Sequence, residues 1–138
     1  MEKFGRAIAE RLRAGDVIAL EGELGAGKTT LARAVIAALG HAGEVPSPTF
    51  TIVETYDPPA VRLPLVHADF YRLERPDEAE EIGLDDYRDG AALIAEWPDR
   101  AGGFGHEPAC LSITLEFAAD GGRIAIASGG ADWLGRMP

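Results

Sequence analysis

The sequence predicts an α/β fold, in which one three-layer domain has a largely parallel central sheet and an antiparallel edge hairpin. Short apolar runs that are typical of buried strands alternate with segments in which apolar residues recur at helical spacing. Residues 16–21 and 91–95 are the clearest strand candidates. Leu31, Val35 and Leu39 mark one face of a helix. The length of 138 residues is enough for a core of ordinary size.

The same patterns predict the other elements. Phe4, Ile8 and Leu12 indicate an amphipathic first helix that ends near Gly15. The remaining expected elements are strands at residues 50–56 and 63–68, a short acidic helix at 76–82, and the two strands of the edge hairpin at 111–117 and 123–127. The predicted domain spans residues 1–138, and its tail, 129–138, has no clear assignment.

Composition and charge restrict the possible partners. No segment approaches the ~20 apolar residues that a membrane span requires, and residues 1–13 carry too many charges for a signal peptide. The one cysteine, Cys110, excludes an internal disulfide and lies beside an alternating apolar run, so we interpret it as a small buried residue. The formal net charge of −10 disfavours direct binding of nucleic acid. These features predict a cytoplasmic protein without membrane contact.

A phosphate-binding loop is the strongest functional signal. The run Gly22-Glu-Leu-Gly-Ala-Gly-Lys-Thr29 fits G-x-x-x-x-G-K-[ST] at every specified position. Its glycines allow backbone N–H groups to converge on phosphate oxygens, and the next helix directs its positive end to the same point. Lys28 can reach the β- and γ-phosphates, and the Thr29 hydroxyl can bind Mg²⁺. The motif predicts a P-loop NTPase fold whose nucleotide is contacted by Glu23, Leu24, Gly25, Ala26, Gly27, Lys28, Thr29 and Thr30.

The lysine in this loop is informative because lysine is rare in the chain. Only Lys3 and Lys28 are lysines among the 13 basic residues. A compact ammonium group fits the bottom of a phosphate cradle, where the wide, planar guanidinium group of arginine does not. The residue type at position 28 therefore supports phosphate binding in addition to the motif.

P-loop proteins also carry an acidic residue at the end of a neighbouring strand, which holds Mg²⁺ or its water shell. Asp69 and Glu96 each follow a predicted strand, so both are candidates. Glu96 has the more apolar strand before it, whereas aspartate is the more usual residue for this role. His67 is explained more readily by a structural hydrogen bond than by acid–base chemistry.

The segment Ser47-Pro-Thr-Phe50 lies between the P-loop helix and the next strand, where nucleotide switches often supply a hydroxyl group to the γ-phosphate region. A plain Ser-Pro turn explains the pattern equally well. Trp97 and Tyr71 are interpreted as core or rim aromatic residues. The acidic segment 74–89 is typical of a solvated face, and a docking surface is the less common use of such a segment.

Five segments, in this order and near this spacing, resemble the TsaE family: residues 22–30, 47–54, 67–73, 82–87 and 96–98. The resemblance covers residues 5–127. It implies an ATPase that works with the TsaB and TsaD proteins, which install threonylcarbamoyl on the adenosine beside the anticodon of tRNAs that read codons beginning with A. It also implies that the ATPase supports turnover of this complex without transferring the group, and that it meets tRNA only through the complex.

The resemblance further implies cofactors and residue roles. The cofactors would be ATP and Mg²⁺, and Glu96 together with Thr29 would bind the metal ion. Asp69 would be a carboxylate that acts through water. Lys28, Asp69 and Glu96 would form the catalytic set. The Ser-Pro loop would be a nucleotide-sensing switch in which Thr49 contacts the nucleotide.

Two other functions stay open at this stage. A small-molecule kinase shares the P-loop, but it needs an acceptor pocket and usually an arginine-bearing lid, for which the chain leaves little length. A nucleotide-gated binding module would carry the same motif as a slow ATPase, and the sequence does not separate the two. The segments beside the P-loop, the Ser47–Phe50 loop and Glu96-Trp97 offer no obvious arginine finger, although Arg72 stays open, so we expect slow hydrolysis until partners dock.

Overall fold

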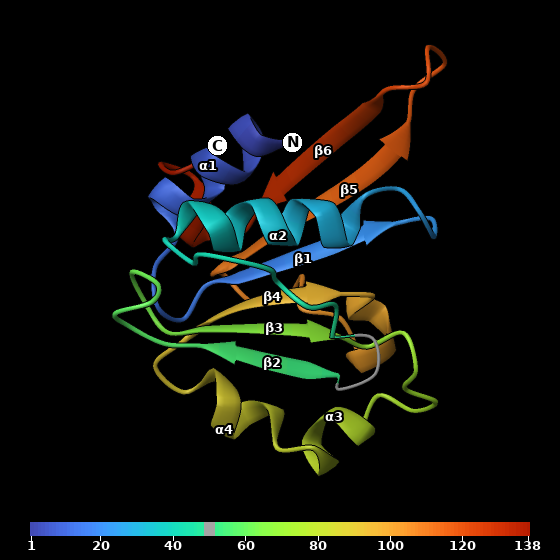
Figure 1. Cartoon of the computed structure of the whole chain (residues 1–138). Coiled ribbons are helices and arrows are strands. Elements are labelled where there is room, and N and C mark those ends of the chain that lie inside the picture. Colours follow the sequence, from blue (N-terminus) through green and yellow to red (C-terminus); the bar gives the residue numbers. More distant parts are fainter. Residues whose placement is uncertain (49–51) are drawn as a thin grey trace.

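Six strands form one sheet in the computed structural model, which describes residues 1–48 and 52–138 (Figure 1). They are β1 (Val17–Gly22), β2 (Val53–Tyr56), β3 (Leu65–Asp69), β4 (Ala92–Glu96), β5 (Cys110–Phe117) and β6 (Arg123–Gly129). Their order across the sheet is β2-β3-β4-β1-β5-β6. The four inner strands run parallel, and β2 and β6 pair antiparallel with their neighbours. The predicted parallel sheet with an antiparallel edge hairpin is confirmed, and the opposite edge is antiparallel as well.

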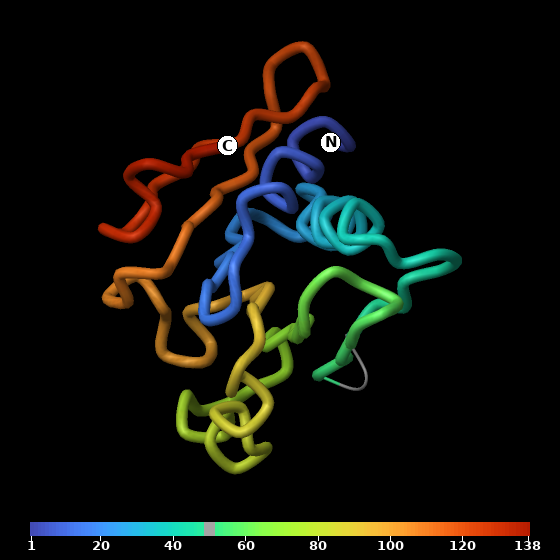
Figure 2. Tube along the Cα trace, turned by 90° about the vertical axis from the view of Figure 1, so that its left-hand side faces the viewer, coloured from blue at the N-terminus to red at the C-terminus, as the bar shows by residue number. Residues whose placement is uncertain are grey.

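Helices cover this sheet on both faces (Figures 1 and 2). The α-helices are α1 (Glu2–Arg11), α2 (Lys28–Ala38), α3 (Glu78–Glu81) and α4 (Leu84–Arg88), and the 3-10 helices are η1 (Pro98–Ala101) and η2 (Ala131–Trp133). α1 and α2 pack on one face, whereas α3 and α4 pack on the other, so the three layers are those that the sequence predicts. None of the helices in the described part of the chain is long and apolar enough to span a membrane.

Two apolar clusters join these layers, one on each face of the sheet. Along β1 the buried side chains alternate between them: Ile18 belongs to the cluster beneath α2, and Val17 and Ala19 belong to the cluster beneath α4. Successive side chains of a strand point to opposite faces, and here both faces are covered. This is why β1 appears in the sequence as a continuous apolar run.

The strand order brings the carboxyl ends of β1, β3 and β4 together. β4 lies between the other two, with Glu96 opposite Asp69 on one side and Leu20 on the other. The chain leaves β1 at Gly22 and enters α2 at Lys28, so the loop between them lies at the same edge. Open parallel sheets bind their ligands at this edge. The fold therefore assembles the predicted loop and both predicted carboxylates.

The tail after β6, which has no assignment from sequence, packs against the start of the chain. Trp133 is fully buried, and its indole N–H donates to the carbonyl of Ala109 at 2.7 Å. Arg136 donates to both carboxylate oxygens of Asp16, at 2.7 and 2.9 Å. It also donates to the carbonyl of Arg11 at 2.7 Å. The tail thus ties the end of α1 to Asp16, the residue that directly precedes β1.

Some element boundaries differ from those predicted. α1 ends before the expected Gly15 because Asp16 accepts the backbone N–H of Arg13 at 2.7 Å and turns the chain there. β3 begins two residues later than expected, because Pro64 has no N–H for the strand ladder. The strand predicted at 50–56 is described from Val53 onward, and its residues 50 and 51 lie outside the described part of the chain.

Candidate nucleotide-binding site

The loop between β1 and α2 has a backbone that favours glycine. Gly22, Gly25 and Gly27 have φ angles of 138°, 82° and 106°, values that residues with a side chain rarely adopt. At Gly22 space is also lacking, since a Cβ atom would lie 2.4 Å from the carbonyl oxygen of Leu115. The glycines therefore determine the conformation of the loop, and α2 begins directly after it.

Lys28 is the buried cation of this loop and is 5% exposed. Its Nζ donates to the carbonyls of Gly22 at 2.6 Å and Glu23 at 3.0 Å. Nζ also lies 4.1 Å from the centre of the Trp97 ring, in a cation–π contact. Burial lowers the pKa of Lys28 from its ordinary value of 10.5, and two nearby carboxylates oppose this effect. In this conformation, backbone carbonyls hold the ammonium group within the loop.

Two buried carboxylates face the start of α2. Asp69 and Glu96 end the adjacent strands β3 and β4. The Thr29 hydroxyl donates to Oε1 of Glu96 at 2.7 Å, which joins the first turn of α2 to the end of β4. Oδ1 of Asp69 accepts the backbone N–H of Tyr71 at 3.0 Å. Of the two carboxylates, Glu96 is the one in contact with the hydroxyl that the motif assigns to Mg²⁺.

His67 lies within the sheet beside Glu96. It is fully buried on β3, and its Nε2 lies 2.7 Å from Oε2 of Glu96. Because Oε1 accepts the Thr29 hydroxyl, the two oxygens of Glu96 contact different elements. Nδ1 of His67 is buried without a hydrogen-bond partner among the described residues. The histidine thus makes a structural hydrogen bond, as the sequence favours, and its partner is a candidate site residue.

Two aromatic side chains form one wall of the site. The rings of Trp97 and Tyr71 lie 5.0 Å apart with an angle of 51° between their planes. Trp97 has a φ of 54°, which is uncommon for a bulky residue. Strain of this kind costs about 1–3 kcal/mol and occurs often at ligand sites. The aromatic pair borders a cavity of about 300 Å³ whose lining also includes Leu24, Gly25, Gly27, Lys28, Thr29, Thr30, Asp69 and Glu96.

The donor atoms at this cavity suit a small, hard cation. Mg²⁺ prefers oxygen ligands and usually takes only one or two carboxylates from the protein, with phosphates and water as the rest. Thr29 Oγ1 and Glu96 Oε1 are two oxygens of this kind. Within residues 1–48 and 52–138, no group of three His, Cys, Asp or Glu side chains could hold a metal ion. The two oxygens of Thr29 and Glu96 fit a Mg²⁺ ion that takes its other ligands from a bound phosphate and water.

Comparison with known proteins identifies the family. The family described as "Threonylcarbamoyl adenosine biosynthesis protein TsaE" matches residues 1–125. The chain belongs to the TsaE family. Its fold matches the crystal structure of YdiB from Bacillus subtilis, with a TM-score of 0.73 and 31% identity, over 96% of this chain and 80% of that one.

Several relatives carry the name tRNA threonylcarbamoyladenosine biosynthesis protein TsaE. The protein from Streptomyces coelicolor is 46% identical over 98 residues, which are 70% of this chain and 66% of that protein. The one from Haemophilus influenzae is 37% identical over 133 residues, 91% of this chain and 82% of that protein. The one from Bacillus subtilis is 48% identical over 95 residues, 68% of this chain and 58% of that protein. The match thus spans less than two thirds of the TsaE protein from B. subtilis.

Most of the residues that are predicted to form the nucleotide site of this TsaE family member lie together. Eight of the predicted site residues line the cavity: Leu24, Gly25, Gly27, Lys28, Thr29, Thr30, Asp69 and Glu96. Glu23 and Ala26 belong to the loop without lining the cavity; Glu23 holds Lys28 through its carbonyl, and Ala26 is fully buried. Thr49 lies outside the described residues. The roles of all these residues toward a nucleotide or metal stay predictions.

Trp97 and Tyr71, expected as core or rim residues, line the cavity, which agrees with a rim position. The place of Trp97 directly after the candidate Glu96 already predicts that it adjoins the site. Another contact of the site is not predicted by the sequence. Arg123 of β6 donates to the carbonyl of Ala26 at 3.1 Å. No local signal indicates that contact, because the pairing of β6 with β5 decides where Arg123 lies.

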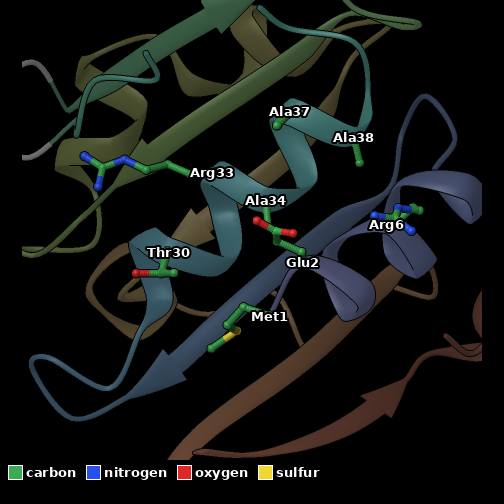
Figure 3. Close-up of a pocket in the computed structure, with 8 residues that line it drawn as sticks. All are labelled: Met1, Glu2, Arg6, Thr30, Arg33, Ala34, Ala37 and Ala38. Atoms are coloured by element: carbon green, nitrogen blue, oxygen red, sulfur yellow. The ribbon is translucent and has the colours of Figure 1, made fainter. Parts of the chain in front are cut away.

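A second groove opens between α1 and α2, beside the phosphate loop. Figure 3 shows Met1 and Glu2, at the start of α1, near Thr30 and Ala34 of α2. The groove has a volume of about 560 Å³, and Arg6, Arg33, Ala37 and Ala38 complete its lining. Thr30 lines both this groove and the phosphate cavity, so the two spaces adjoin.

Proposed function

We propose that this chain is a Mg²⁺-dependent ATPase in the synthesis of N6-threonylcarbamoyladenosine on tRNA. It acts in the cytoplasm with the TsaB and TsaD proteins, supports turnover of their transferase complex, and does not transfer the group itself. It meets tRNA only through that complex, which its net charge of −10 supports. The ATPase part rests on one observation, the contact of Thr29 with Glu96 beside the loop that holds Lys28. Membership of the TsaE family supports the pathway.

Lys28 is the residue that we assign to the phosphates. Its ammonium group now has two backbone carbonyls and an aromatic face as partners, and none of these groups carries a full negative charge. Burial lowers its pKa, and the nearby carboxylates Glu96 and Asp69 oppose this effect without bonding to the ammonium group directly. Phosphate oxygens would compensate its positive charge, and the loop N–H groups and the N-terminus of α2 would bind them as well.

Thr29 and Glu96 are the residues that we assign to Mg²⁺. When bound, the ion would neutralise negative charge on the phosphates during transfer of the γ-phosphoryl group. Glu96 contacts the Thr29 hydroxyl directly, which supports it as the protein carboxylate that binds the ion. Asp69 is opposite Glu96 in the sheet and lines the same cavity, so we assign to it an outer position in which it binds water.

Slow hydrolysis by the chain alone is also part of the proposal. Among the described residues, the lining of the phosphate cavity includes no arginine. An arginine finger raises the rate of P-loop hydrolysis by about 10³–10⁵, and a partner protein can supply it. Arg72 stays a candidate within the chain, because it follows Tyr71, which lines the cavity. We therefore expect the main acceleration to come from TsaB, TsaD or both.

The groove between α1 and α2 offers a place for the nucleoside. It adjoins the phosphate cavity at Thr30, and Ala34, Ala37 and Ala38 give it an apolar side (Figure 3). A nucleotide with its phosphates at Lys28 could therefore extend its base along α2. Arg33 is partly engaged elsewhere, because its Nε donates to the carbonyl of Val45 at 2.9 Å.

The proposed function is tested by calorimetric titration with ATP and by phosphate release with and without TsaB, TsaD and tRNA. We expect ATP binding that Mg²⁺ strengthens, slow release by the chain alone, and a large acceleration by the partners. Binding without acceleration would indicate a nucleotide-gated binding module instead. Transfer of phosphate to a small-molecule acceptor would indicate a kinase. Absence of ATP binding would overturn the proposal as a whole.

A further inference from the structure

We propose that His67 is a positioning residue for Glu96: it holds Oε2 from within the sheet and so leaves Oε1 directed to the metal position. The inference rests on the proposed Mg²⁺ site and adds a residue to it. His67 is fully buried and does not line the phosphate cavity. It would therefore act on the ion only through Glu96.

The position of His67 in the fold favours an apolar side chain. It is on β3 between Leu65 and Asp69, on the face of the sheet that α2 covers, and it is opposite Ile94 of β4. Its Nδ1 is buried without a hydrogen-bond partner among the described residues. An unsatisfied buried polar atom costs about 1–3 kcal/mol. A leucine would avoid that cost, so we infer that the advantage of a histidine at this position comes from the contact that Nε2 makes.

That other nitrogen makes a short contact with a carboxylate. Nε2 lies 2.7 Å from Oε2 of Glu96. An ionised carboxylate accepts hydrogen bonds only, so Nε2 carries the proton and donates it. Nδ1, on the other side of the ring, has no hydrogen-bond partner among the described residues. His67 and Thr29 thus hold the two oxygens of Glu96 from opposite sides.

Binding of a cation changes this balance. An ion held by Thr29 Oγ1 and Oε1 of Glu96 would take up a lone pair of Oε1, the oxygen that now accepts the Thr29 hydroxyl. The bond from His67 goes to the other carboxylate oxygen, Oε2, and would not compete with the ion. It would keep Oε2 in place while Oε1 faces the cavity. Residues that orient a metal ligand in this way typically contribute about 10–100-fold to metal affinity.

The test measures Mn²⁺, a paramagnetic substitute for Mg²⁺, by electron paramagnetic resonance on the complex with a non-hydrolysable ATP analogue. His67→Leu should raise the dissociation constant of Mn²⁺ about 10–100-fold. His67→Gln, whose amide nitrogen can reach the place of Nε2, should restore most of the affinity. His67→Asn is too short to reach Oε2 and should behave like His67→Leu. His106→Leu is the control, because His106 is exposed and does not line the phosphate cavity.

Binding of the analogue in EDTA separates this inference from the proposed function. All four variants should bind it within about twofold of the wild type, since phosphate binding belongs to the loop. Equal Mn²⁺ affinity in His67→Leu and the wild type would overturn the role of His67 while the nucleotide site stands. Equal behaviour of the Gln and Asn variants would also overturn it, even if the Leu variant does not fold. A wild-type protein that binds no analogue would instead reject the proposed function.

Discussion

Thr29 and Glu96 are 67 positions apart in the sequence, yet the hydroxyl of one donates to the carboxylate of the other at 2.7 Å. The contact joins the first turn of the helix after the phosphate loop to the end of β4. Both oxygens are hard donors, and they already lie close enough to share a small cation. This geometry makes Glu96, rather than Asp69, the carboxylate whose loss should disturb metal binding most.

Replacement of the two carboxylates tests that order. Glu96→Gln should raise the Mg²⁺ concentration needed for half-maximal ATP hydrolysis by about 10-fold or more, whereas Asp69→Asn should raise it less, since an outer partner contributes through water. The measurement is a Mg²⁺ titration of phosphate release at saturating ATP, in the presence of the partner proteins. Both substitutions keep the size of the side chain, so each serves as control for the other. The opposite order would show that the two roles are exchanged.

Removal of the buried ammonium group should weaken nucleotide binding. Lys28→Ala should lower ATP affinity by about 10–100-fold, because charge-assisted hydrogen bonds contribute roughly 1.5–3 kcal/mol. Isothermal titration calorimetry measures this directly. Lys3→Ala is a matched control, since Lys3 is an exposed residue of α1 outside the lining of both cavities. Unchanged affinity in Lys28→Ala would contradict the assignment of the loop.

Loss of the contact between the tail and Asp16 should destabilise the fold without affecting the site. Arg136 and Asp16 form a two-bond ion pair whose side chains are 10% and 4% exposed. Arg136→Ala leaves a buried carboxylate unpaired and should lower the free energy of unfolding by about 3–5 kcal/mol. Urea denaturation measures this loss of stability.

The control for this prediction is Arg75→Ala. Arg75 also contacts carboxylates, but it is 57% exposed, and exposed pairs contribute only about 0–1 kcal/mol. ATP affinity of Arg136→Ala, measured at a temperature at which the protein is folded, should equal that of the wild type. Equal stability of the two variants would show that the tail contact adds little.

The buried thiol should be unreactive in the folded protein. Burial raises the pKa of Cys110 above its ordinary value of 9.0, and a weak contact with Ser112 opposes this shift only in part. The thiolate, which is the reactive form, is therefore scarce at pH values below the raised pKa. Labelling by a disulfide reagent at pH ~8 should be at least ~100-fold slower in the native state than in urea.

The same shift determines the pH dependence of stability. Above pH 9.0, the ordinary pKa of cysteine, the unfolded chain releases the Cys110 proton while the folded chain keeps it. The free energy of unfolding should then fall as the pH rises, and Cys110→Ala should lack this part of the decrease. Rapid labelling of the native protein at neutral pH would contradict the burial of the thiol.

Local features of the site are determined by the sequence alone. The phosphate loop could be predicted because its glycines, Lys28 and Thr29 are neighbours in the chain, and a loop conformation depends mainly on nearby residues. The strands could be predicted from apolar runs, since each strand must bury its own side chains. Asp69 and Glu96 were candidates because each follows such a run.

Only the tertiary structure decided which residues meet. From the residues alone, Asp69 and Glu96 are alternative candidates for the carboxylate that binds Mg²⁺. The strand order places the two side by side, and the Thr29 hydroxyl donates to Glu96. It likewise gives His67 its partner and brings the unassigned tail onto Asp16. Strand order and register result from the packing of the whole core, which is shared among residues far apart in the chain. Local patterns do not contain that information, so pairwise contacts across the sheet had to come from the fold.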